Sequence, residues 1–142
     1  MKKIWLIVIL ALLLIPGSLA YGEQKRVVGT VVIDGTTLKD TALVVNGNTM
    51  IPFRELFENL GMTVQWYPKK KIVIAEGADI KIVLTMGVST VTINEKIVPL
   101  TQSPFHDSLE NKFLVNTRVV AEAVGGTVDW DNIKKVATIT SK

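Results

Sequence analysis

Two stretches of the chain place apolar side chains at helical spacing, and a glycine closes each of them. Residues 53–60 and 117–124 carry mostly apolar residues at i, i+3, i+4 and i+7, which predicts a helix with one buried face. Gly61 and Gly125 follow directly, and glycine commonly ends a helix in the left-handed conformation. The pattern therefore predicts two short helices of about nine residues each.

Each predicted helix is followed by residues that alternate between apolar and polar, the pattern of a half-buried strand. Val64 and Trp66 share one face of the first such strand, and Val128 and Trp130 share one face of the second. A polar turn and a β-branched run come next in both places, as in a β-hairpin. The stretch 101–111 has no periodicity and is expected to be the least ordered interior segment. Further strands are expected at residues 27–33, 42–45, 80–84, 88–93 and 113–115.

The two helix-hairpin segments also match each other in sequence. A shift of 64 residues aligns 46–75 with 110–139 without a gap, which indicates a duplicated supersecondary unit. Strands with two short helices and no regular strand–helix alternation predict an α+β fold with mostly antiparallel pairing. The fold class expected from the sequence is therefore α+β, built from a duplicated short helix plus β-hairpin. The matching positions are Arg54 and Arg118, Glu58 and Glu122, Gly61 and Gly125, Trp66 and Trp130, and Lys70-Lys71 and Lys134-Lys135.

The N-terminal 20 residues have the composition of a secretory signal peptide. Two lysines precede an apolar run of 12 residues, Ile4 to Ile15, and small residues at Ser18 and Ala20 suit cleavage after Ala20. The expected organisation is a signal peptide at 1–20, a short linker at 21–26 and one domain at 27–142. An uncleaved membrane anchor is the alternative, although the apolar run is shorter than the span of about 20 residues that a bilayer requires.

Composition removes several function classes. The signal peptide contains two lysines and no acid, so 14 basic residues face 13 acidic ones in the remaining chain, and its net charge of +1 gives no argument for nucleic-acid binding. There are no cysteines and one histidine, which excludes a disulfide framework, thiolate catalysis and a multi-imidazole copper site. We therefore expect no catalytic residue, no metal site and no cofactor.

Three segments together resemble a known family. These are MIPFRELFENLGMTVQWYPKKKIVIA, STVTINEKIVPL and FLVNTRVVAEAVGGTVDWDNIKKVATIT, which begin at residues 50, 89 and 113. They are similar to the copper amine oxidase N-terminal domain-like family of secreted bacterial proteins, over about residues 27 to 141. The resemblance implies a mostly antiparallel sheet curled around the helices. It also implies a stalk-type domain that lies apart from the catalytic domain, which holds the copper and the quinone.

The tryptophans and the lysine-rich turns are the candidate binding residues. Trp66 and Trp130 could stack on sugar rings of a wall polysaccharide, or they could pack on the helices as core residues. The lysines at the two hairpin turns could bind an anionic cell-wall polymer, or they could simply be solvated. These candidates for polymer binding are Lys69, Lys70, Lys71, Lys134 and Lys135.

The repeated arginine–glutamate pairs have several interpretations. A helical i,i+4 pair contributes only about 0.2 to 0.5 kcal/mol, so we expect Arg54 and Arg118 to bind carbonyls of the preceding strand or an adjacent loop and fix each helix on the sheet. A clamp for a substrate carboxylate is the alternative. An enzyme that hydrolyses wall polymers through Glu58, Glu122 and Asp107 is a further one.

The function expected from the sequence is a non-catalytic, exported module that binds or scaffolds at the bacterial cell envelope. Its partner would be a cell-wall polymer or another envelope protein, with no nucleic acid and no membrane contact after signal cleavage. The alternatives are a structural spacer without a ligand and, less in keeping with the residues, the hydrolase.

Overall fold

β-Strands dominate the protein. The computed structural model describes residues 26–142, so the expected signal peptide and most of the expected linker lie outside the described residues. Strands hold 50% of the structure and helices 12%. The elements are β1 (Val27–Ile33), β2 (Thr36–Thr37), β3 (Ala42–Val45), β4 (Asn48–Pro52), α1 (Phe53–Asn59), β5 (Thr63–Tyr67), β6 (Ile72–Glu76), β7 (Lys81–Thr85), β8 (Thr90–Ile93), β9 (Lys96–Pro99), β10 (Phe105–Asp107), β11 (Lys112–Asn116), α2 (Thr117–Ala123), β12 (Thr127–Asp131) and β13 (Val136–Thr140).

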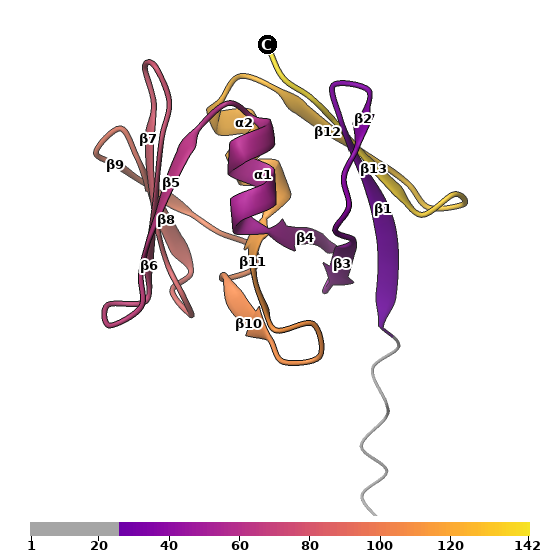
Figure 1. Ribbon diagram of the computed structural model, residues 1–142, viewed down its shortest axis with the longest axis horizontal. Helices are drawn as coiled ribbons and strands as arrows, with labels where there is room; N and C mark the ends of the chain where they lie inside the picture. The colour runs from indigo at the N-terminus through magenta and orange to yellow at the C-terminus, as the bar shows by residue number, and fades with distance from the viewer. Residues whose placement is uncertain (1–25) are drawn as a thin grey trace, which may run out of the picture.

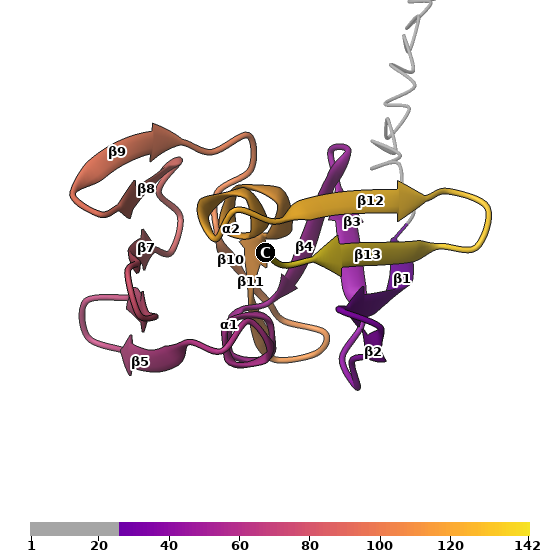
Figure 2. The ribbon, with the colours of Figure 1, turned by 90° about the horizontal axis from the view of Figure 1, so that it is seen from above.

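The strands form two sheets with the helices between them. One sheet has eight strands in the order β10-β11-β4-β3-β1-β13-β12, with β2 paired to β1, and the other is a five-stranded meander from β5 to β9. Neighbouring strands are antiparallel except for β1 and β13, which are parallel. Figures 1 and 2 both show α1 and α2 lying between the β5–β9 sheet and the β1-β12-β13 part of the other sheet.

The α+β prediction is wrong. The helices have seven residues each, about two turns, because the last apolar position of each series lies at the C-cap residue, Leu60 or Val124. Helices this short cannot form a layer, and each buries only three residues. The hairpins after them also lie in different sheets, β5–β6 in the meander and β12–β13 beside β1. The fold is therefore a two-sheet, mostly β structure rather than a duplicated helix-hairpin unit.

One hydrophobic core joins both sheets and both helices. Phe57 and Leu56 of α1 and Val120 of α2 are at most 1% exposed. They pack with side chains from the inner faces of the strands, which alternate with exposed positions along each strand. The strand residues of this core that are 0% exposed are Val31, Ala42, Ile51, Val73, Ala75, Val115 and Ile139.

Segment 101–111, expected to be the least ordered interior part, contains one short strand and has two buried residues. It contains β10, which pairs with β11, and it buries Pro104 and Asp107. The Arg26 guanidinium donates two hydrogen bonds to the Asp107 carboxylate, at 2.9 and 2.5 Å. This ion pair joins the start of β1 to β10 and holds the segment in place without local sequence periodicity.

Candidate binding groove

Four aromatic rings form a continuous column between the two sheets. Trp66 of β5 lies 6.0 Å from Phe53 of α1 and 4.7 Å from Phe113 of β11, measured between ring centroids. His106 of β10 lies 4.8 Å from Phe113 on the far side, and the Arg54 guanidinium lies 5.6 Å from the centre of the Phe53 ring. Tilted rings at these separations attract one another beyond the area they bury. The column is therefore a rigid wall made from residues distant in sequence.

A groove of about 590 Å³ opens along this wall, a volume within the range of small-molecule binding sites. We call it the aromatic groove. It is lined by residues of the β5–β6 hairpin, the β7–β8 turn, β10 with the proline before it, and β11. Its lining residues are Trp66, Pro68, Lys71, Met86, Gly87, Pro104, Phe105, His106 and Phe113.

The only charged side chain in the aromatic groove is a lysine. Among residues 26–142, Lys71 lines the groove and no carboxylate does. No ion pair in the same range involves Lys69, Lys70 or Lys71. The turn is held firmly, because the Lys71 carbonyl accepts the Met86 N–H at 2.9 Å. The groove thus offers aromatic faces beside an unpaired positive charge.

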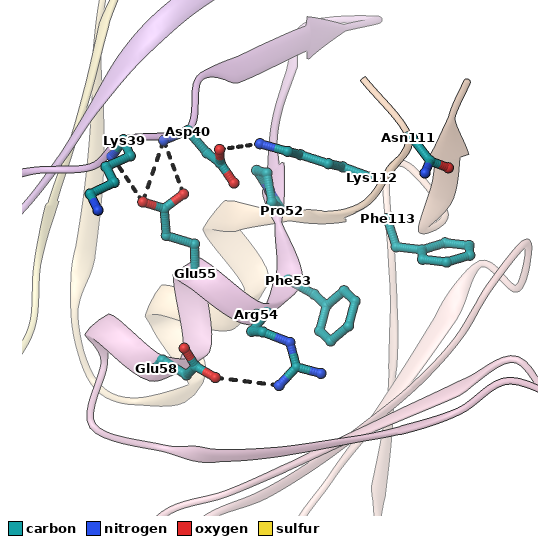
Figure 3. A pocket seen from close by; sticks show the side chains of 10 residues that line it. All are labelled: Lys39, Asp40, Pro52, Phe53, Arg54, Glu55, Glu58, Asn111, Lys112 and Phe113. Atoms are coloured by element: carbon teal, nitrogen blue, oxygen red, sulfur yellow. Dashed lines mark hydrogen bonds and ion pairs between the residues drawn. The ribbon is translucent and has the colours of Figure 1, made fainter. Parts of the chain in front are cut away.

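A second groove of about 380 Å³ shares Phe113 with the first, and Figure 3 shows its side chains. We call it the charged groove. Four of its six charged residues form ion pairs: Lys112 pairs with Asp40, and Arg54 pairs with Glu58 at 3.4 Å. Its lining residues are Lys39, Asp40, Pro52, Phe53, Arg54, Glu55, Glu58, Asn111, Lys112 and Phe113.

Glu55 is the centre of the charged groove. Its carboxylate accepts the backbone N–H of Lys39 at 2.9 Å and that of Asp40 at 3.1 Å, and Figure 3 shows it reaching toward this segment. Burial, together with the neighbouring Asp40 carboxylate, raises the pKa of Glu55. The carboxylate therefore serves to hold the 39–40 segment against α1, and the pairing leaves this groove with less free charge than its composition suggests.

The two lysine turns lie far from each other. Lys69, Lys70 and Lys71 occupy the β5–β6 turn, and Lys134 and Lys135 occupy the β12–β13 turn. In Figures 1 and 2 these hairpins lie at opposite sides of the molecule. The Lys135 ammonium also donates to the Asn132 side chain at 2.7 Å. The structure therefore brings Lys71 together with Trp66 but does not bring the two lysine clusters together.

The repeated arginines do not make the contacts we expected. Arg54 and Arg118 are 55% and 65% exposed, and their nearest acids are Glu58 at 3.4 Å and Glu122 at 4.0 Å. Within residues 26–142, no hydrogen bond joins either guanidinium to a backbone carbonyl of a strand or a loop. Gly61 and Gly125 follow the helices with φ of +74° and +78°.

Trp130 occupies a different environment from Trp66. Its ring packs on the backbone of Gly29 in β1, where an added Cβ would lie 2.5 Å from the indole and 2.6 Å from the Lys135 carbonyl oxygen. Trp130 is half-buried and covers the junction of β1 with β13. The two tryptophans thus hold different parts of the fold, and only Trp66 lines the aromatic groove.

The carboxylates proposed for hydrolysis lie apart. Glu58 and Glu122 pair with arginines on separate helices, and Asp107 binds Arg26, which holds the pKa of Asp107 below its usual range through that hydrogen bond. Within residues 26–142, no group of three or more His, Cys, Asp or Glu side chains is arranged to hold a metal ion. In the same range, neither helix has the length and apolar character needed to cross a bilayer.

The family follows from comparison with known proteins. The model of the copper amine oxidase N-terminal domain matches residues 32–140, which is most of the chain. The chain belongs to the copper amine oxidase N-terminal domain family. The resemblance predicted from the sequence is therefore confirmed. Searches of curated proteins and of solved structures gave no match.

The family's domain is non-catalytic. The copper in its name does not fit the residues of this chain, because a copper site of the oxidase type requires several imidazoles and His106 is the one histidine. We therefore expect no copper site of this type, because the chain has too few imidazoles to form one.

Three residues important for the grooves were missed in the sequence. Phe113 was expected in a strand but not as a groove residue, and His106 was counted only as the one histidine of the chain. Glu55 carried a usable signal, because the matching position 64 residues later is Val119. Where one segment has a charged residue and the matching position of the other has an apolar one, the charged residue is a candidate for a contact that the other segment does not make.

Proposed function

We propose that this domain is a non-catalytic binding module of the bacterial cell envelope and that the aromatic groove binds an anionic wall polymer. The single observation that carries the proposal is the placement of Lys71 beside Trp66, Phe113 and His106 in a groove with no carboxylate. The C–H face of a sugar or polyol packs on aromatic rings, while a phosphate or carboxylate of the same polymer is attracted by the lysines.

The charge distribution supports an anionic ligand. Lys69 and Lys70 lie next to Lys71 on the same exposed turn, so a polymer that leaves the groove would pass two further cations. The charged groove is a weaker candidate because four of its six charged residues already pair with one another. Exposed charges attract one another over about a Debye length, so we expect binding to weaken strongly with salt.

The test compares the two lysine turns. The variant Lys70→Gln with Lys71→Gln removes two charges at the aromatic groove, and Lys134→Gln with Lys135→Gln removes the same two charges at the distant turn. Binding of residues 21–142 to insoluble cell wall is measured with and without wall teichoic acid, at low and high salt. We expect loss of binding only for the first variant and only for polymer-containing wall.

A fluorescence titration locates the contact directly. Trp5 lies in the expected signal peptide, so Trp66 and Trp130 are the two tryptophans of residues 21–142. A Trp130→Phe protein reports from Trp66 alone, and a Trp66→Phe protein reports from Trp130 alone. Purified teichoic acid should change the emission of the first and not of the second. Equal loss of binding in both lysine variants, or a response only from Trp130, would contradict the proposal.

A further inference from the structure

The first and last strands of the domain lie side by side and run in the same direction. β1 pairs with β13 in parallel from Thr30 opposite Val136 to Ile33 opposite Ile139. The chain therefore enters the ladder at one end and leaves it at the other. Figure 1 shows β1 beginning at the bottom of the molecule and the C-terminus at the top.

This geometry decides how the ladder responds to tension. When the two ends of the chain are pulled apart, β1 and β13 are drawn past each other along their length. All the hydrogen bonds between them then share the load and must break together, whereas bonds pulled from one end break one after another. In a parallel ladder the bonds are evenly spaced, so the load is distributed over the whole pairing.

The ladder is reinforced at both ends. At the entry end, the Thr30 N–H donates to the Lys135 carbonyl at 2.8 Å, beneath the Trp130 ring that packs on Gly29. At the exit end, the Asp34 carboxylate accepts the Ser141 N–H at 2.8 Å and the Ser141 hydroxyl at 2.5 Å. Sliding of one strand requires these contacts to break with the ladder.

The opposite flank of β1 is also held. Val27, Val28 and Gly29 pair antiparallel with Val44, Leu43 and Ala42 of β3, in that order. β13 is paired along its other edge with the whole of β12. Neither terminal strand is at the edge of the sheet. Load applied at either end is therefore passed into the eight-stranded sheet rather than onto one pair of strands.

We infer that the domain is a load-bearing element, in which the β1–β13 ladder resists tension applied between the two ends of the chain. This mechanical function goes beyond ligand binding and does not depend on it. A domain that links two attachment points in an envelope under tension would need such a ladder to stay folded.

The experiment changes only the direction of pulling. The chain has no cysteine, so two introduced cysteines define the points where handles attach for single-molecule force spectroscopy. Val28→Cys with Lys142→Cys loads the ladder along its length, because both positions lie beyond opposite ends of the pairing. Thr36→Cys with Lys142→Cys loads it from one end, because Thr36 follows the turn after β1. All three side chains are exposed.

We expect the lengthwise pair to unfold at a severalfold higher force than the one-ended pair at the same loading rate, since forced unfolding is governed by the unfolding barrier. As a control, both variants should have the melting temperature of wild type, which shows that they differ only in the direction of pulling. If Thr36→Cys lowers that temperature, Thr37→Cys gives the same direction of load. Equal forces in the two directions, or a higher force in the one-ended direction, would overturn the inference.

Discussion

Removal of the Arg26 side chain tests whether the ion pair with Asp107 holds the 101–111 segment. The guanidinium makes two hydrogen bonds to this carboxylate, at 2.9 and 2.5 Å, and the Asp107 side chain is only 8% exposed while that of Arg26 is 30% exposed. A hydrogen bond to a charged group contributes about 1.5 to 3 kcal/mol. Because water reaches Arg26, the lower part of that range applies, and Arg26→Ala should reduce the free energy of unfolding by about 1.5 to 2 kcal/mol.

The predicted loss is large enough to measure in two ways. With an unfolding entropy of about 2.1 cal/mol/K per residue, it lowers the melting temperature by about 6 to 8 °C. Urea denaturation followed by tryptophan fluorescence gives the free energy directly. Arg26→Lys keeps the charge but loses the paired geometry, so its effect should lie between those of wild type and Arg26→Ala.

The pH dependence provides a second criterion. The hydrogen bond from Arg26 lowers the pKa of Asp107 in the folded protein. The resulting stability is present above the pKa of Asp107 in the unfolded chain and is lost as the pH falls through the lower folded value. The gap between wild type and Arg26→Ala should therefore shrink between neutral pH and about pH 3. A loss below about 0.5 kcal/mol at neutral pH, or a gap that does not change with pH, would refute the reasoning.

Three further changes have defined outcomes. Gly29→Ala should destabilise the protein by about 1 to 3 kcal/mol or more, because the added Cβ would lie 2.6 Å from the Lys135 carbonyl oxygen; a melting temperature equal to that of wild type would contradict the close packing. The pKa of Glu55 is raised in the folded protein, so wild type should lose stability relative to Glu55→Gln as the pH rises through the unfolded and then the folded pKa, and urea titrations at a series of pH values measure this. The Thr117 hydroxyl is buried without a hydrogen-bond partner among residues 26–142, so Thr117→Val should raise the free energy of unfolding by about 1 kcal/mol. Urea denaturation measures this free energy, and a lower value for the variant would show that the hydroxyl is hydrogen-bonded in solution.

Local sequence signals predicted the strands that end in clear turns. The bounds of β1 and β3 agree with the expected ranges 27–33 and 42–45, because Asp34-Gly35 and Asn46-Gly47 have the positive φ that tight turns require. β10 was missed because three residues show no alternation, and because Arg26, which holds Asp107, lies 81 positions away. The parallel pairing of β1 with β13 is equally non-local, since no sequence pattern in either strand identifies the other as its partner.

The candidate groove could be predicted only in part. Trp66 and Lys71 were recognised one at a time, from the hairpin that contains both. Phe113 and His106 join them through β10 and β11, which belong to the other sheet, and no spacing along the chain relates these two pairs. Sequence patterns predict which face of a strand is apolar, but the contact between two sheets depends on the whole arrangement.

The pairing of β1 with β13 also limits when the protein can fold. Thr30 and Val136 are 106 positions apart, and contacts between residues so distant along a chain form slowly because a long loop must close first. The eight-stranded sheet cannot be completed while β13 is still being synthesised. A chain delivered from its N-terminus, whether from a ribosome or through a pore, would thus keep β1 without its parallel neighbour until β13 had emerged. Because β1 and β13 pair late, the chain stays unfolded enough to pass through a pore and completes its fold only afterwards.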